Sequence, residues 1–402
     1  MNISKQLSNV LTDNQFAALK IIGDSAYYLD VEAFLVGGSV RDLILGTKLN
    51  DIDVCIESDL KTFIDSIPDS DREVITISQF GTAKIKICDE IIDLVMTRME
   101  FYSESGELPY VTFSDIHNDI YRRDFTINTL AVSVVPNKWG ELLDICGGMS
   151  DIKSRIIRIL HPTSLLDDPT RIFRAFRYSV RLGFEIDQLT LDSIDLNSIT
   201  RLSGIRISNE LKHIFSEKKC VETLNQLEEF NILKSIHPEL SFSGHLGHVF
   251  SKNHTEIASC LDYGILLIVR DIKSPITRMI LGKRLGLTKN MIKAITDIEN
   301  IERLPVSKYS DLYSLLNEVS DLTLAISKMY EGNSVKSQID IFINELRHIN
   351  LKITGVDVME KGISGLRVGI ILEKMKTLLL DGEVADTQSA QIAMLGQLIE
   401  SE

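Results

Sequence analysis

Several features that mark metal knuckles, redox centres and membrane proteins are missing from this sequence. Only five of its 402 residues are cysteine, and none are spaced as Cys-x-x-Cys, which excludes a zinc knuckle and a thioredoxin-type centre. A scattered, odd set of cysteines is typical of reduced thiols in a cytoplasmic protein. Residues 1–19 lack the basic start and continuous apolar run of a signal peptide. Apolar runs such as 264–269 are far too short to span a bilayer, so we expect a cytoplasmic protein with no membrane partner.

Positive charge is also scarce. The chain has 43 Lys and Arg against 57 Asp and Glu, a formal net charge of -14, which excludes a generic polyanion binder held by overall charge. A local basic face stays compatible with nucleic acid. The content of 44% hydrophobic and 25% charged residues is typical of a globular protein, and the length suits two to four domains of roughly 150 residues each.

The hydrophobic pattern changes once along the chain. Before residue 150 it alternates with the period of a strand, which predicts an α/β region with a mixed or antiparallel sheet. From residue 152 onward the period is that of a helix, most clearly at 168–182 and 205–215. The expected strands are 32–36, 51–56, 73–78, 83–87, 91–96, 126–134 and 141–145, with helices at 1–30 and 39–45 and a hairpin turn at 88–90.

Two aspartates stand one residue apart at the start of a predicted strand. Asp51 and Asp53 would point to the same side, because alternate side chains of a strand face the same way. Two carboxylates held that close repel each other unless a cation lies between them. Hard oxygen ligands suit Mg²⁺, which usually takes one or two carboxylates together with substrate phosphates. The pair is either a magnesium site or a polar turn with two solvated acids.

Two glycines precede this pair, where a strand ends and a helix begins. Gly37 and Gly38 would let backbone amides approach a phosphate, and Arg41, one turn into the helix, could reach the same phosphate. The alternative is a plain tight turn. The pattern Gly-x-x-x-x-Gly-Lys-Ser/Thr is absent, which excludes a P-loop. Asp42 stays open between supporting the helix and belonging to the site.

A third acid, Asp93, alternates with apolar neighbours in the predicted strand 91–96. It is either an ordinary exposed position or the third carboxylate of a catalytic two-metal site. In such a site the metals hold the attacking and leaving oxygens, and the protein contributes positioning and electrostatics rather than a general-base histidine.

Five segments, in this order, resemble the signature motifs of the class II tRNA nucleotidyltransferases. That family also includes bacterial poly(A) polymerases and separate CC-adding and A-adding enzymes. The resemblance implies an α+β nucleotidyltransferase head of the DNA polymerase β type at 1–150. It also implies an all-helical remainder, with a base-selecting neck at 151–215 and a tRNA-binding body and tail at 216–402. The segments are FLVGGSVRDLILGTKLNDIDVCIE (34–57), YRRDFTINTLA (121–131), LLDICGGMSDIKSRIIR (142–158), DDPTRIFRAFRYSVRLGF (167–184) and LSGIRISNELKHIF (202–215).

The resemblance also implies roles for single residues. Arg123 would contact the phosphates of the nucleotide, and Asn128 a ribose hydroxyl. Asp168 and Arg171 would read the incoming base. An aspartate accepts from the amino group of cytosine or adenine, and an arginine donates to the ring nitrogen. Uracil and guanine present the opposite pattern, so the pair would accept CTP and ATP and reject UTP and GTP.

Charged residues recur every three positions from Asp168 through Arg171, Arg174 and Arg177. Residues three apart are neighbours on a helix, and the apolar residues between them would pack the other side. The stripe is either an exposed, salt-bridged face or, by the resemblance, a nucleotide-binding face. A local basic surface that can steer RNA would include these arginines together with Lys153, Arg155, Arg158 and Arg181.

The segment 97–119 resembles the family's flexible loop, which helps to switch specificity from C to A. It carries Gly-Glu-Leu-Pro where many CCA-adding members have Arg-His-Pro-Asp, and Arg98 and Glu100 are candidate anchors. The function implied is Mg²⁺-dependent addition of CMP, AMP or both, from CTP and ATP, to the 3′ acceptor end of tRNA, with release of pyrophosphate. Addition of CC only, addition of A only, poly(A) synthesis and a non-catalytic RNA- or nucleotide-binding regulator stay open. The oligomeric state also stays open.

Overall fold

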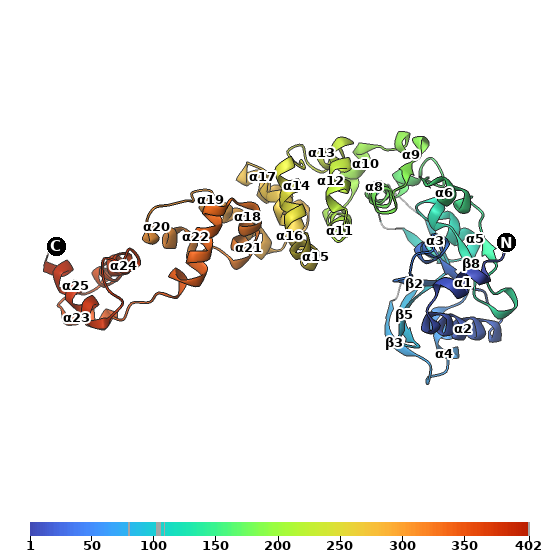
Figure 1. The fold of residues 1–402 in the computed structure, drawn as a ribbon, viewed down its shortest axis with the longest axis horizontal. Helices are drawn as coiled ribbons and strands as arrows, with labels where there is room; N and C mark the ends of the chain where they lie inside the picture. Colours follow the sequence, from blue (N-terminus) through green and yellow to red (C-terminus); the bar gives the residue numbers. More distant parts are fainter. Residues whose placement is uncertain (79–80, 102–105, 108, 401–402) are drawn as a thin grey trace. The chain divides into compact units, whose positions relative to one another are not determined.

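The computed structural model describes residues 1–78, 81–101, 106–107 and 109–400. Residues 102–105 and 108 of the predicted loop therefore lie outside the described residues. The chain divides into two compact units, the first made of Met1–Glu210 and Glu222–Ile236 and the second of Leu211–Val221 and His237–Glu402. Figure 1 shows that the main strands gather in the N-terminal part of the chain, whereas the later part is almost entirely helical.

A seven-stranded sheet forms the centre of the first unit. Its strands are β1 (Ala33–Val36), β2 (Ile52–Ile56), β3 (Glu73–Ser78), β4 (Thr82–Ile87), β5 (Glu90–Met96), β8 (Ala131–Ser133) and β9 (Leu142–Leu143). Their order in the sheet is β3-β4-β5-β2-β1-β8-β9. Neighbours run antiparallel except β2 and β5, which run parallel. The mixed, mostly antiparallel sheet confirms the sequence prediction.

One face of this sheet is covered by helices. The helices α2 (Asp13–Tyr28) and α4 (Leu60–Ser66) pack on β5. Along β4 and β5 the buried residues Ile85, Ile92 and Leu94 alternate with the more exposed Lys84 and Asp93, as expected of strands with one covered face. Along these two strands the opposite face carries the charged side chains.

The turn between β4 and β5 is the hairpin expected from the sequence. Cys88 and Asp89 both have positive φ, 49° and 65°. A two-residue hairpin turn of type I′ requires positive φ at both central residues, because its twist then matches that of the flanking strands. This turn fixes the register in which β4 lies against β5.

The strand predicted at 126–134 is wrong in its first half. Thr126–Asn128 forms a 3-10 helix, and only Ala131–Ser133 joins the sheet. The hydroxyl of Thr126 donates to Asp151 (2.6 Å), and that of Thr129 donates to the carbonyl of Thr126 (2.6 Å). Such local side-chain bonds offer the backbone an alternative to a strand ladder.

The helical patterns predicted from the sequence are confirmed. α8 runs from Thr170 to Leu182 and α11 from Gly204 to Phe215. Asp168 lies just before α8 rather than inside it. The other helices up to residue 236 are α1 (Ser4–Val10), α3 (Gly38–Ile44), α5 (Ile116–Tyr121), α6 (Gly148–Ser154), α7 (Ser164–Asp167), α9 (Gln188–Asp192), α10 (Leu196–Arg201), α12 (Cys220–Glu229) and α13 (Ile232–Ile236). The small strand pairs are β6 (Arg98–Phe101) with β7 (Tyr110–Phe113) and β10 (Ile156–Ile157) with β11 (Glu185–Ile186).

The second unit is built from helices in the part that the structure describes. One apolar cluster centres on Leu312, Leu316 and Phe342, and another on Met375 and Leu395. Among the described residues we find no helix with the length and apolar character needed to cross a membrane. The helices are α14 (Gly244–Lys252), α15 (His254–Ser259), α16 (Asp262–Arg270), α17 (Pro275–Arg284), α18 (Lys289–Thr296), α19 (Ile298–Ile301), α20 (Tyr309–Leu316), α21 (Asp321–Tyr330), α22 (Asn333–Asn344), α23 (Gly355–Glu360), α24 (Leu366–Leu380) and α25 (Gln388–Glu400).

Replacing Gly23 by Ala should destabilise the first unit. In an open helix this change adds about 0.5–1 kcal/mol of stability, but a Cβ at Gly23 would lie 2.0 Å from the carbonyl oxygen of Val134. We expect overpacking that lowers the free energy of unfolding by about 1–3 kcal/mol, measured by thermal unfolding. The matched control is Gly369→Ala in α24, where nothing lies within 4 Å of the added Cβ. A Gly23→Ala protein as stable as this control would contradict the packing described.

Candidate active site

A cleft with a volume of about 790 Å³ lies in the first unit. Its walls come from the turn between β1 and α3, the start of β2, the residues after α5, and α8. Of the residues that the sequence singled out for the site, all of which the structure describes, only Asp93 and Arg177 do not line it. Those that do are Gly37, Gly38, Arg41, Asp51, Asp53, Arg123, Asn128, Asp168, Arg171 and Arg174.

The turn between β1 and α3 requires glycine. Gly37 has φ 63° and ψ -129°, a conformation that residues with a side chain rarely adopt. A Cβ at this position would also lie 2.8 Å from Nη1 of Arg123. Gly37 therefore allows the turn and leaves the space that this guanidinium fills. Gly38 is less constrained, because a Cβ there would lie 3.4 Å from the guanidinium of Arg41.

Ser39 of α3 fixes the two aspartates that follow. Its hydroxyl donates to the carbonyl oxygen of Asp51 (3.1 Å) and accepts from the backbone N–H of Asp53 (3.1 Å). Asp53 lies in β2 and is half-buried, whereas Asp51 lies just before the strand and is exposed. One buried hydroxyl thus holds both residues beside the cleft.

Asp53 is held in an unfavourable electrostatic environment. Burial raises its pKa above the ordinary value, and the carboxylates of Asp93 and Asp51 raise it further, against the lowering effect of Arg123 and Ser39. A cation beside Asp53 would relieve this repulsion, so the donor chemistry fits a hard divalent ion that takes part of its ligands from a substrate. No group of three or more His, Cys, Asp or Glu residues among the described residues is placed to hold a metal. Asp93 instead pairs with Lys84, Nζ to Oδ1 2.7 Å.

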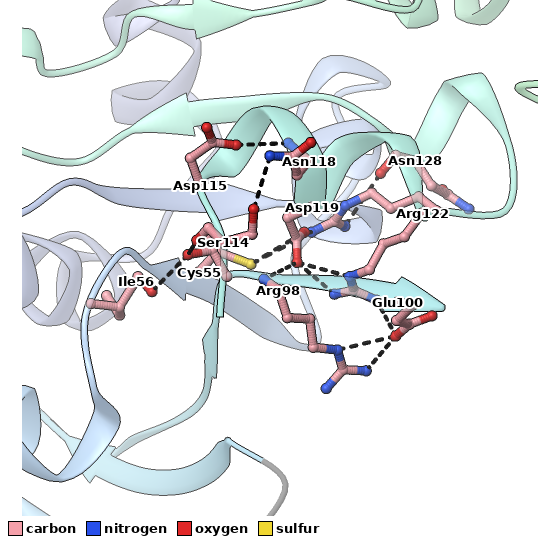
Figure 2. Close-up of polar contacts among 12 residues, drawn as sticks. Cys55, Ile56, Arg98, Glu100, Ser114, Asp115, Asn118, Asp119, Arg122 and Asn128 are labelled. Carbon is pink, nitrogen blue, oxygen red and sulfur yellow. Dashed lines mark hydrogen bonds and ion pairs between the residues drawn. The ribbon is translucent and has the colours of Figure 1, made fainter. Parts of the chain in front are cut away.

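Asp119 is a fully buried carboxylate that holds two arginines (Figure 2). Oδ1 accepts from Nε and Nη2 of Arg122 (2.9 and 2.7 Å), and Oδ2 accepts from Nη2 of Arg123 (2.7 Å). Burial raises the pKa of Asp119, but Arg123 and Arg122 outweigh burial and the pKa is lowered. Glu100 accepts from both Arg98 and Arg122, so the two candidate loop anchors belong to this network.

A second buried carboxylate, Asp124, holds Arg174. Nε and Nη2 of Arg174 donate to its Oδ2 (2.9 and 2.6 Å), and Nδ2 of Asn128 donates to its Oδ1 (2.9 Å). Burial raises the pKa of Asp124, but Arg174 and Asn128 lower it to about 2. Asn128 also accepts from Nη1 of Arg41 (2.6 Å). Arg41, Asn128, Asp124 and Arg174 therefore form one chain of charge-assisted hydrogen bonds along the cleft.

Asp168 and Arg171 line the cleft but already have protein partners. Oδ1 of Asp168 accepts from Nη2 of Arg206 (2.7 Å). Arg171 donates to the hydroxyl of Ser164 (2.5 Å) and to the carbonyl oxygen of Arg122 (2.7 Å). These contacts hold both side chains in place at the cleft.

Arg206 also connects Asp168 to the loop at 97–119. Its Nη1 donates to the carbonyl oxygens of Gly106 (2.9 Å) and Glu107 (3.4 Å), the first two residues of the Gly-Glu-Leu-Pro segment. A single guanidinium thus contacts both the predicted base-reading carboxylate and the loop that was predicted to influence specificity.

Tyr178 lies among four arginines. The guanidinium carbons of Arg41, Arg174, Arg177 and Arg181 lie 5.4, 5.3, 4.9 and 5.0 Å from its ring centroid, within the range of cation–π attraction. Its hydroxyl accepts from Nη2 of Arg174 (3.0 Å). Arg181 lines the cleft, whereas Arg177 does not, so Arg177 is the one arginine of the predicted three-residue spacing that the cleft does not include.

Sequence reasoning missed four residues that organise the cleft. The sequence held a partial signal for two of them. Asp119 stands three positions before Arg122 and four before Arg123, and Tyr178 stands four positions after Arg174. Residues three or four apart lie together on a helix. No local signal marked Ser39 or Arg206, because their partners lie 14 and 38 positions away.

Comparison with known proteins agrees with this architecture. Residues 33–158 match the model of the poly A polymerase head domain, and residues 183–243 match the probable RNA and SrmB-binding site of polymerase A. Both models describe parts of poly(A) polymerases, and the similar proteins among known sequences are tRNA nucleotidyltransferases. It is 31% identical to an A-adding tRNA nucleotidyltransferase of Geobacter sulfurreducens, over 92% of this chain but only 45% of that protein. A second A-adding tRNA nucleotidyltransferase, of Halalkalibacterium halodurans, is 28% identical over 90% of this chain and 87% of its own length.

Solved structures of the family share the fold over the whole chain. A CCA-adding enzyme in an apo form superposes with a TM-score of 0.79 at 26% identity, covering 100% of this chain and 99% of that one. The Thermotoga maritima CCA-adding enzyme complexed with tRNA gives a TM-score of 0.70 at 26% identity and covers 99% of each chain. The nucleotidyltransferase head with a mixed sheet, followed by a mostly helical region, is therefore confirmed.

Replacing Asp53 by Asn should raise the thermal stability of the metal-free protein at pH 7, by roughly 1–3 °C. The pKa of Asp53 is raised in the folded state, so the ionised carboxylate lowers stability at every pH above that folded pKa. The gain should shrink as pH falls through the folded pKa, where wild-type Asp53 takes up a proton. Calorimetry in EDTA over a range of pH measures the difference.

The control for this experiment is Asp24→Asn, an exposed carboxylate on α2. It should leave the midpoint unchanged. A lower midpoint for Asp53→Asn in EDTA would contradict the repulsion described here.

Proposed function

We propose that this chain is a template-independent RNA nucleotidyltransferase that adds AMP, CMP or both, from ATP and CTP, to the 3′ acceptor end of tRNA. The observation that carries the proposal is that Asp51 and Asp53 line the same cleft as several arginines, among them Arg41, Arg123 and Arg174. Its volume of about 790 Å³ lies within the range of small-ligand sites. The similarity to A-adding and CCA-adding tRNA nucleotidyltransferases supports the reaction class.

The triphosphate would lie against Arg41 and Arg123. Both guanidiniums are buried or nearly so and are held by fixed partners, Arg123 by Asp119 and Arg41 by Asn128. Fixed donors stabilise developing charge without having to reorganise during the reaction. Asn128 would contact a ribose hydroxyl from the same place, which favours ribonucleotides.

Asp51 and Asp53 would hold Mg²⁺, with the remaining ligands supplied by the phosphates of the nucleotide. When bound, the ion would neutralise the triphosphate and favour ionisation of the attacking 3′-hydroxyl. The protein's own part is positioning. Ser39 holds the two carboxylates, and Arg123 offsets part of the repulsion around Asp53. We expect Asp93 to act as a further carboxylate of the site only if its pair with Lys84 opens.

Asp168 and Arg171 would select the base. Asp168 would accept from the amino group of adenine or cytosine, and Arg171 would donate to the ring nitrogen. A base that presents a carbonyl and an N–H at these positions would leave both groups unpaired. Arg206 supports this assignment, because it holds Asp168 in the cleft.

Addition of A alone is the second candidate. The Geobacter and Halalkalibacterium relatives are both named A-adding tRNA nucleotidyltransferases. The loop points the same way, since Gly-Glu-Leu-Pro replaces the Arg-His-Pro-Asp of many CCA-adding members. We propose that residues 216–402 bind the tRNA, and the likeness to the tRNA-bound Thermotoga maritima enzyme supports this role.

The purified full chain should extend tRNA in the presence of Mg²⁺. Two substrates are needed, one ending before CCA and one ending in CC, each incubated with CTP, with ATP and with both. A CCA-adding enzyme extends both substrates, whereas an A-adding enzyme extends only the second, by one AMP. Gel electrophoresis resolves each added nucleotide.

The Asp53→Asn protein serves as the control, because it should bind tRNA with wild-type affinity in a gel-shift assay and extend neither substrate. Loss of its metal ligand removes the chemistry while the RNA-binding surface is untouched. A wild-type protein that binds tRNA but extends neither substrate would favour the regulator instead.

A further inference from the structure

A row of charged side chains crosses three neighbouring strands beside the cleft. Lys84 of β4 lies opposite Asp93 of β5, and Asp93 lies opposite Asp53 of β2. Directly opposed residues of a sheet project to the same face, with Cβ atoms about 5 Å apart. The sheet therefore presents one cation and two carboxylates in sequence, with the cation at the outer end.

Lys84 is bonded to Asp93 through both carboxylate oxygens. Its Nζ lies 2.7 Å from Oδ1 and 2.9 Å from Oδ2. The hydrogen bond to Asp93 raises the pKa of Lys84, and the charges of Asp51 and Asp53 add to the effect. The ammonium is therefore influenced by all three acids that were candidates for the metal site. It is already paired with Asp93, the residue predicted from the sequence as a possible third carboxylate of the metal site.

We propose that Lys84 is a built-in counter-cation of this row, which keeps Asp93 engaged and weakens divalent-metal binding at Asp51 and Asp53 until a nucleotide is present. The proposal rests on the proposed function, because it takes Asp51 and Asp53 as the metal ligands. Lys84 touches neither the cleft nor the reacting atoms, so it is a positioning residue that acts through Asp93.

The physical reason is direct competition for negative charge. An ammonium bonded to Asp93 neutralises that carboxylate, so that less negative charge attracts a divalent ion that approaches Asp53. Without a third carboxylate the ion depends on phosphate oxygens to complete its ligands. Metal and nucleotide would then bind together, and the empty cleft would not hold the metal tightly.

The test is a Mn²⁺ titration of the full chain without nucleotide, with free Mn²⁺ followed by electron paramagnetic resonance. Lys84→Met keeps a side chain of similar length without its charge and should bind Mn²⁺ roughly three- to tenfold more tightly than wild type. Lys84→Arg keeps the charge and should stay within about twofold of wild type. The Lys84→Met effect should disappear in an Asp93→Asn background, since Lys84 acts through that carboxylate. Thermal unfolding confirms that each variant folds.

Equal or weaker Mn²⁺ binding by Lys84→Met would overturn the inference, as would a gain that persists in Asp93→Asn. Failure of the proposed function gives a different result. In that case, with ATP present in both titrations, the Asp53→Asn protein would bind Mn²⁺ as tightly as wild type. The two failures are therefore distinguishable in one set of titrations.

Discussion

The cleft depends on two buried carboxylates that allow partly buried arginines to lie beside them. A buried charge without a partner is strongly unfavourable, and removing one partner of such a pair costs about 3–5 kcal/mol. Asp119 neutralises Arg122 and Arg123, and Asp124 neutralises Arg174. Both carboxylates lie within one short stretch. The segment 119–124 therefore fixes the side chains of its own two arginines and that of Arg174 in α8.

This charge balance makes the site asymmetric. The arginine side is preorganised, because its carboxylates and Asn128 hold the guanidiniums before any ligand arrives. The Asp51–Asp53 side has the opposite character, since Asp53 is surrounded by other acids and opposed chiefly by Arg123. A nucleotide with its cation would satisfy both sides at once, because phosphates suit the arginines and the ion suits the aspartates.

Much of this arrangement could be predicted from local sequence. The Gly37–Gly38 turn, the strand with Asp53 and the arginines of α8 are each encoded by short-range pattern, and apart from Arg177 the structure places them beside the cleft. The 3-10 turn at 126–128 was not predictable from periodicity, because the deciding bond runs from Thr126 to Asp151. Partners far apart in the sequence, such as Ser39 with the aspartates and Arg206 with Asp168, appear only when the chain is folded.

Protein partners occupy most charged groups of the cleft in this structure. Arg206 takes an oxygen of Asp168, and Arg171 is bonded to Ser164; beside the cleft, Lys84 is bonded to Asp93. A ligand must therefore join or displace an existing partner. Its binding free energy is then the difference between the new contacts and the protein contacts that it replaces. The Asp51–Asp53 pair differs, since ionising Asp53 is already disfavoured before anything binds. A cation bound beside Asp53, as proposed above, would therefore relieve an existing repulsion rather than displace a protein partner.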